Sequence, residues 1–153
     1  QRFREILNQR KLTQIISGNT DSNNADGNVS LLQSPDNICV TDNFVYFQED
    51  PNSFSRNHAA YIYQSDLNGN NARPVLEFVI RQDLVENGSS GFSGEYGALI
   101  DISDKVGVPG TFILNLQPHY WTDASFAGRD GHTLEGAEDT QGGQIVILQG
   151  LPR

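Results

Sequence analysis

The sequence contains one cysteine, no methionine and no long run of apolar residues. A single cysteine cannot form a disulfide within the chain, and Cys39 lies in an apolar run between Ile38 and Val40. We therefore predict that Cys39 is a small buried hydrophobic side chain, with metal binding or pairing with another chain as the alternatives. Because no apolar run approaches the roughly 20 residues of a membrane-spanning helix, we expect no membrane span.

Positive charge is also scarce, since 10 lysine and arginine residues stand against 19 acidic residues and give a formal net charge of −9. A surface that binds nucleic acid needs basic patches to neutralise phosphates, so we expect no nucleic-acid partner. Several basic residues fall within residues 1–16, where Phe3, Ile6 and Leu7 have the spacing of a helical apolar stripe. This segment is predicted to be a short amphipathic helix with a solvated basic face, and anion binding is the alternative.

Glycine, asparagine and aspartate interrupt the apolar runs throughout the chain, which favours an all-β fold with many turns over a helical bundle. The 153 residues correspond to about one domain. Residues 17–30 have too little apolar surface to pack and are predicted to be a surface loop. A calcium loop through Asp21, Asn23 and Asp26 is the alternative, although the segment lacks the bidentate glutamate of an EF-hand. Residues 31–153 contain the predicted strands.

Residues 31–51 predict a β-hairpin. Ile38–Val40 and Phe44–Phe47 are β-branched and aromatic runs, and Thr41–Asn43 between them has the composition of a turn. Carboxylates that rigid strands place at the mouths of loops suit the binding of a hard metal ion or acid–base catalysis. Three such carboxylates lie at the outer ends of this hairpin: Asp36, Glu49 and Asp50.

Short turns and long polar segments alternate along the rest of the chain. Asn68–Gly69 is a tight-turn signal, and we interpret residues 66–70 as a turn although they resemble the start of an EF-hand loop. Long polar segments span residues 81–96 and 122–143. Such an alternation is typical of β-propeller blades, whose long loops gather at one face. Five further strands are predicted: Tyr61–Leu67, Arg73–Ile80, Ala98–Ile102, Thr111–Leu116 and Gln144–Gln149.

The number of predicted strands, about seven, suffices for about two propeller blades, whereas a propeller needs four or more blades of four strands. We therefore expect the chain to be a C-terminal fragment of a larger propeller, with a small sandwich as the alternative. The sequence begins at Gln1 rather than at a methionine, which suggests processing or a fragment boundary. Residues 150–153 have the composition of a true C-terminus.

Four short motifs follow one another along the chain: Ser34–Ile38, Glu49–Asp50, Tyr61–Gly69 and Phe112–His119. Their order resembles the C-terminal part of the PhoX-type alkaline phosphatases. In that family a similar SPDN hairpin ends in an acidic pair, and a strand of the YIYQSDLNGN kind follows in the same blade. The resemblance covers most of residues 31–119.

The resemblance implies a six-bladed propeller with calcium and iron(III) in its central channel, completed by the remainder of the propeller chain. It also implies hydrolysis of small phosphomonoesters outside the cytoplasm, in the periplasm or after secretion. Metal ions in such a site polarise the phosphoryl oxygens and neutralise developing charge. The family motif points most clearly to Glu49 as a metal ligand. Asp36 and Asp50 are weaker candidates than Glu49, because an aspartate after a proline can equally cap a turn.

Two other functions stay open at this point: a non-catalytic propeller segment that serves as a binding or assembly module, and a calcium-dependent lactonase-like or esterase-like propeller. Cys39 does not correspond to the family's iron-ligating cysteine, and the sequence assigns no catalytic residue. His119 lies at a predicted strand end, where it could reach a metal or a phosphate or be a polar surface residue. His132, Glu135 and Glu138 would share a helix face and could bind a metal, but the surrounding glycines favour a loop.

Overall fold

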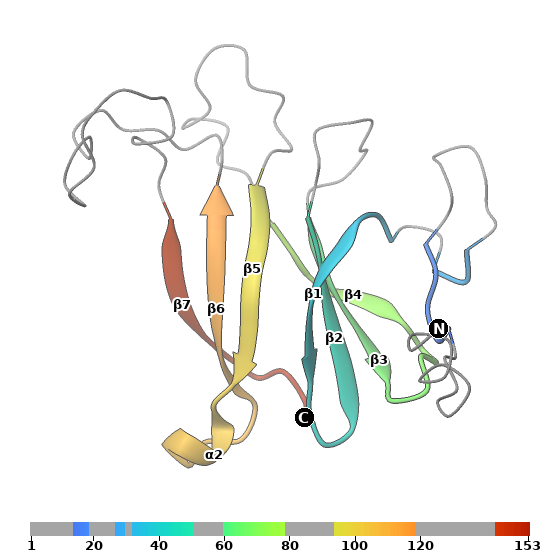
Figure 1. The fold of residues 1–153 in the computed structure, drawn as a ribbon. Coiled ribbons are helices and arrows are strands. Elements are labelled where there is room, and N and C mark those ends of the chain that lie inside the picture. Colours follow the sequence, from blue (N-terminus) through green and yellow to red (C-terminus); the bar gives the residue numbers. More distant parts are fainter. Residues whose placement is uncertain (1–13, 19–26, 30–31, 51–59, 79–93, 119–142) are drawn as a thin grey trace, which may run out of the picture.

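Alternating apolar and polar residues form two antiparallel sheets in the computed structural model (Figure 1). The structure describes residues 14–18, 27–29, 32–50, 60–78, 94–118 and 143–153. The first sheet has four strands in the order β1-β2-β3-β4, and the second has three in the order β5-β6-β7. Each strand pairs with its neighbour in sequence, so both sheets are simple meanders.

Short turns with local hydrogen bonds connect the strands of the first sheet. The backbone N–H of Thr41 donates to the carbonyl of Phe44 at 2.9 Å and closes the first hairpin. After β3, the Asp66 carboxylate accepts backbone N–H bonds from Asn70 and Asn68, which lower the pKa of Asp66, and Gly69 has a φ of 83°. These bonds confirm the prediction of a turn at residues 66–70. The strands are β1 (Pro35–Val40), β2 (Phe44–Glu49), β3 (Tyr61–Asp66) and β4 (Arg73–Glu77).

The second sheet consists of β5 (Gly94–Asp101), β6 (Thr111–Pro118) and β7 (Gln144–Gln149). The prediction of a loop through Tyr96 was wrong, because β5 begins at Gly94. A Cβ atom at position 94 would lie 2.5 Å from Cε1 of Phe78, so close packing of the ring explains this glycine. The short helix α2 (Ser103–Val106), which the sequence did not predict, ends at Gly107 with a φ of 70°.

The main core lies between the two sheets. Tyr46 and Ile62 of the first sheet are fully buried there, and the Tyr46 ring meets Phe112 of the second sheet edge-to-face at 5.6 Å. The predicted burial of Cys39 is confirmed, since its side chain is 7 % exposed within this core and its thiol is free. The core residues are Cys39, Tyr46, Ala60, Ile62, Phe78, Tyr96, Leu99, Phe112 and Leu114.

The opposite face of the first sheet is covered as well. Val45, Phe47 and Tyr63 alternate with the residues of the main core and pack against Val29 and Leu32 from the preceding segment. The Phe47 and Tyr63 rings stack in parallel at 5.4 Å. The second sheet lacks such a cover among the described residues, because three isoleucines of its outer face are more than half exposed: Ile100, Ile145 and Ile147.

The two ends of the sheets differ. Three short connections, within residues 41–43, 67–72 and 102–110, lie at one end. The strand ends that border residues 51–59, 79–93 and 119–142 lie at the other end (Figure 1). This arrangement follows from the meander, and it agrees with the expectation that the long polar segments start from a common end.

The chain's last residues join the two sheets at the end with the short turns. The Tyr46 hydroxyl donates to the carbonyl of Pro152, and Nδ2 of Asn43 donates to the carbonyl of Arg153 at 2.7 Å. The Arg153 guanidinium bonds both carboxylate oxygens of Asp104 and lies 3.0 Å from Asp101. We call residues 150–153 the C-terminal strap, because they contact the hairpin of the first sheet and the α2 region of the second.

The all-β prediction is therefore confirmed, whereas the propeller stays a prediction. The expected N-terminal helix of residues 1–16 falls mostly outside the described residues, and residues 14–16 form neither helix nor strand. Most of the polar loop of residues 17–30 is likewise outside them. In the described part of the chain, no helix has the length and apolar character needed to cross a membrane.

Candidate functional site

The hairpin of β1 and β2 places the three predicted carboxylates at the end from which the long segments start. Pro35 pairs with Glu49, and the register then shifts, which leaves Asp36 at an irregularity in β1. The backbone N–H of Asp50 donates to the carbonyl of Ser34 at 3.0 Å, so the strand ends stay together beyond the last ladder pair. The backbone pairing of β1 with β2 therefore brings Asp36, Glu49 and Asp50 to the same end of the hairpin, as predicted.

Glu49 is the most enclosed of the three carboxylates. Its side chain is fully buried, on the same face of the first sheet as Val45 and Phe47. Oε1 accepts the backbone N–H of Gln33 at 2.7 Å, and Oε2 accepts the backbone N–H of Tyr61 at 3.0 Å. A buried carboxylate is costly unless hydrogen bonds compensate it, and these two bonds fix the direction in which it points.

The other two carboxylates have different surroundings. Asp36 is exposed and accepts a hydrogen bond of 2.8 Å from Nδ2 of its neighbour Asn37. Asp50 is partly buried at the end of β2. Within the described ranges, no three His, Cys, Asp or Glu side chains form a group that could hold a metal ion. Glu49 is thus a single oriented carboxylate, and a complete metal site would also need ligands from residues other than the described ones.

Gln48, which the sequence analysis did not single out, adds a buried amide at the same end of β2. Its side chain is fully buried, and neither amide atom has a hydrogen-bond partner among the described residues. Such a group is uncommon in native proteins, where most buried polar atoms are bonded. The sequence could have revealed Gln48, because it occupies a position where the alternation of Phe44 and Tyr46 predicts an apolar residue.

Several predicted candidates lie outside the described residues, and their placement is not tested. They include the histidine at the predicted strand end and the residues of the possible calcium and metal-binding loops: Asp21, Asn23, Asp26, His119, His132, Glu135 and Glu138.

Comparison with known proteins identified no related protein. The chain has no significant match to a protein-family model, to a curated protein or to a solved structure. The functional interpretation therefore rests on the residues and on their arrangement.

Proposed function

We propose that this chain is part of a metal-dependent phosphomonoester hydrolase built on a β-propeller, which acts outside the cytoplasm, in the periplasm or after secretion. The proposal combines the order of the motifs in the sequence with the two adjacent meander sheets, which are suitable as propeller blades. Calcium and iron(III) are the proposed cofactors. The remainder of the propeller would supply the other blades and most of the site.

The observation that carries the proposal is the environment of Glu49. A carboxylate that binds a metal ion is commonly oriented by hydrogen bonds to its oxygens, and Glu49 receives one backbone N–H on each oxygen. Each carboxylate oxygen has two lone-pair positions, so an oxygen that accepts an N–H bond can also bind a cation. Glu49 also lies at the strand end from which residues 51–59 continue, as a ligand in a loop-lined site would.

Bound metal ions would supply charge neutralisation and polarisation of the phosphoryl oxygens. Glu49 would hold one ion at a fixed position because its carboxylate cannot turn without breaking the bonds to Gln33 and Tyr61. Asp36 and Asp50 remain proposed as additional ligands. Their places beside the end of β2 put them within the same part of the first sheet.

The test is to measure hydrolysis of p-nitrophenyl phosphate and metal content in the complete protein and in its Glu49→Gln variant. Glutamine keeps the shape of the side chain but removes its charge and one acceptor oxygen. We expect loss of turnover together with loss of one class of bound metal, while the far-ultraviolet circular dichroism of the β-sheets persists.

Asp42→Asn is a matched control, because Asp42 is an exposed carboxylate in the turn at the opposite end of the same hairpin. This variant should keep both activity and metal content. Full activity and unchanged metal content in Glu49→Gln would contradict the proposed role of Glu49. Calcium without iron in the active protein would favour the lactonase-like or esterase-like alternative instead.

A second candidate function is a non-catalytic assembly module. The outer face of the second sheet favours it, because Ile100, Ile113 and Ile147 are cross-strand neighbours in one row. The occupant we propose is a further β-sheet with an apolar face, such as the next blade, since the first sheet already packs on the inner face of β5-β6-β7 in this way. A complete protein without tightly bound metal would support this function over the hydrolase.

A further inference from the structure

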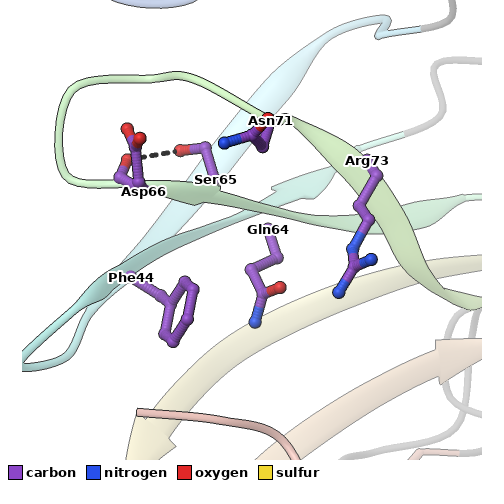
Figure 2. A pocket seen from close by; sticks show the side chains of 6 residues that line it. All are labelled: Phe44, Gln64, Ser65, Asp66, Asn71 and Arg73. Atoms are coloured by element: carbon purple, nitrogen blue, oxygen red, sulfur yellow. Dashed lines mark hydrogen bonds between the residues drawn. The ribbon is translucent and has the colours of Figure 1, made fainter.

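A hollow lies away from the three carboxylates, toward the end of the first sheet that carries the short turns. It has a volume of about 210 Å³. Figure 2 shows Phe44, Gln64 and Arg73 projecting from the same face of the sheet, with the Gln64 carboxamide between the Phe44 ring and the Arg73 side chain. The three residues come from β2, β3 and β4, and Gln64 pairs directly with Arg73. Three adjacent strands therefore present an aromatic ring, an amide and a cation to one space.

Arg73 brings a positive charge that the described part of the chain does not neutralise. Its side chain is exposed and forms no ion pair with another described residue. Asp66 also lines the hollow, but its carboxylate accepts the N–H groups of Asn68 and Asn70 in the turn. Arg73 thus has no acidic partner within the described ranges, although the sequence has nearly twice as many acidic residues as basic ones. A guanidinium in this situation is suited to a carboxylate ligand, which it can bind through two parallel hydrogen bonds.

The orientation of the Gln64 amide follows from a chain of hydrogen bonds. The Tyr46 hydroxyl has one proton and donates it to the carbonyl of Pro152, so its oxygen must accept the bond from Gln64. The Gln64 atom at 2.7 Å from this oxygen is therefore the nitrogen Nε2. Gln64 is 4 % exposed, and its remaining amide atom, the oxygen Oε1, is an acceptor. A ligand in the hollow would consequently lie near a hydrogen-bond acceptor, Oε1 of Gln64, and a cation, the Arg73 guanidinium.

We propose that this hollow binds a small hydroxycarboxylate or aminocarboxylate. The carboxylate pairs with the Arg73 guanidinium, the hydroxyl or amino group donates to Oε1 of Gln64, and the carbon skeleton lies against the Phe44 ring. The volume suits a compound of a few carbon atoms rather than a drug-sized molecule. The site is independent of the proposed hydrolase function, because none of its residues is among the carboxylates at the other end of the hairpin.

The test is a titration of the ¹⁵N-labelled 153-residue chain with L-lactate, followed by the NMR signals of the Arg73 Nε–H and the Gln64 side-chain amide. We expect saturable shifts confined to residues around the hollow. Acetate, which lacks the donor group, should bind more weakly than lactate. Inorganic phosphate is the third probe and should bind more weakly than lactate, because it has no carbon skeleton to lie against the Phe44 ring.

Arg73→Gln should weaken lactate binding about tenfold or more, as expected for the loss of a charge-assisted pair. Lys105→Gln removes another exposed cation, from α2, and is the matched control, which should bind lactate like the unmodified chain. Tyr46→Phe removes the group that orients Gln64, so it should reduce the preference for lactate over acetate while acetate binding persists.

The proposal is overturned if lactate causes no saturable shift, or if Arg73→Gln and Lys105→Gln weaken binding equally. Equal affinity for lactate and acetate would also overturn it, since the Gln64 acceptor would then have no part in recognition. Arg73 is exposed, so failure of its variant to fold is not expected, and the amide spectrum of each variant checks this directly.

Discussion

The two sheets differ in how many of their faces are covered. The four-stranded sheet packs on both sides, with Tyr46 and Ile62 toward the second sheet and Phe47 and Tyr63 toward the preceding segment. Among the described residues, the three-stranded sheet packs on one side only, and its outer isoleucines are exposed, with Ile147 at 60 %. The first sheet can therefore hold buried polar groups in fixed positions, as it does for Glu49 and Gln64, whereas the second offers a surface for another layer.

This difference also explains why both proposed sites belong to the first sheet. A carboxylate or amide keeps one orientation only when packing and hydrogen bonds restrict it, and Glu49 and Gln64 satisfy this condition. The outer residues of β7 have no comparable restriction among the described contacts. The first sheet, which is covered on both faces, is thus suited to binding small ligands, whereas the second sheet is suited to assembly.

The largest expected effect comes from Phe112→Ala. Phe112 is fully buried between the sheets, so its truncation should lower the free energy of unfolding by about 3–5 kcal/mol. Ile147→Ala, on the outer face of the same sheet, should change it by no more than about 0.5 kcal/mol. Urea denaturation of both variants measures the contrast. Similar losses in the two would mean that the outer face is covered in solution.

A smaller effect is expected at the C-terminal strap. The hydrogen bond and charge of Arg153 lower the pKa of Asp104. Burial works against the same shift at Asp101, but the bonds from Ser103 and the charge of Arg153 leave its pKa lowered too. The unfolded chain therefore binds more protons than the folded one, and this stability is present above the ordinary aspartate pKa of 3.8 and is lost as the pH falls through the lowered values.

We accordingly expect the melting temperature of Arg153→Ala to lie below that of the unmodified chain at neutral pH, with the gap closing in acid. Melting curves recorded from pH 7 down to about pH 2 test this. Lys105→Ala is the comparison, because the charge of Lys105 also lowers the pKa of Asp104 but less than Arg153 does, so its gap should be smaller. A gap that is constant with pH would show that the strap contributes packing alone.

The smallest effect on stability is expected for the double substitution Ile145→Lys and Ile147→Lys. Both side chains are exposed, so the free energy of unfolding should change by less than about 1 kcal/mol. Self-association of the chain, measured by sedimentation velocity, should decrease, because charge on this face disfavours contact with another apolar sheet. The control is Gln144→Lys, which adds a charge to an exposed position of β7 whose side chain belongs to the other face of the strand. Equal loss of association in both would indicate a general effect of charge.

Much of the fold was predictable because it depends on local patterns. The bounds of β7 coincide with the predicted strand, and the hairpin of β1 and β2 follows from two apolar runs around a turn. The start of β5 was missed because Gly94 has the appearance of a loop residue, whereas the Phe78 ring requires it. Helix α2 was missed because four residues show no helical period.

The candidate sites were predictable only in part. Glu49 was found because the acidic pair after a strand is visible in the sequence. Its bonds to Gln33 and Tyr61 depend on backbone groups 16 and 12 residues away, which no local pattern reveals. The meeting of Gln64 with Arg73 depends on the register of β3 and β4, and the role of Tyr46 depends on a carbonyl 106 residues distant.

The C-terminal strap has a consequence for the order of folding. Each sheet is a meander whose strands pair with their neighbours in sequence, and such local contacts form early and at low entropic cost. The bonds from Tyr46 and Asn43 to the strap span 106 and 110 residues, so they close a loop that contains almost all of both sheets. We therefore expect the strap to dock after the sheets have formed, because its contacts close this long loop.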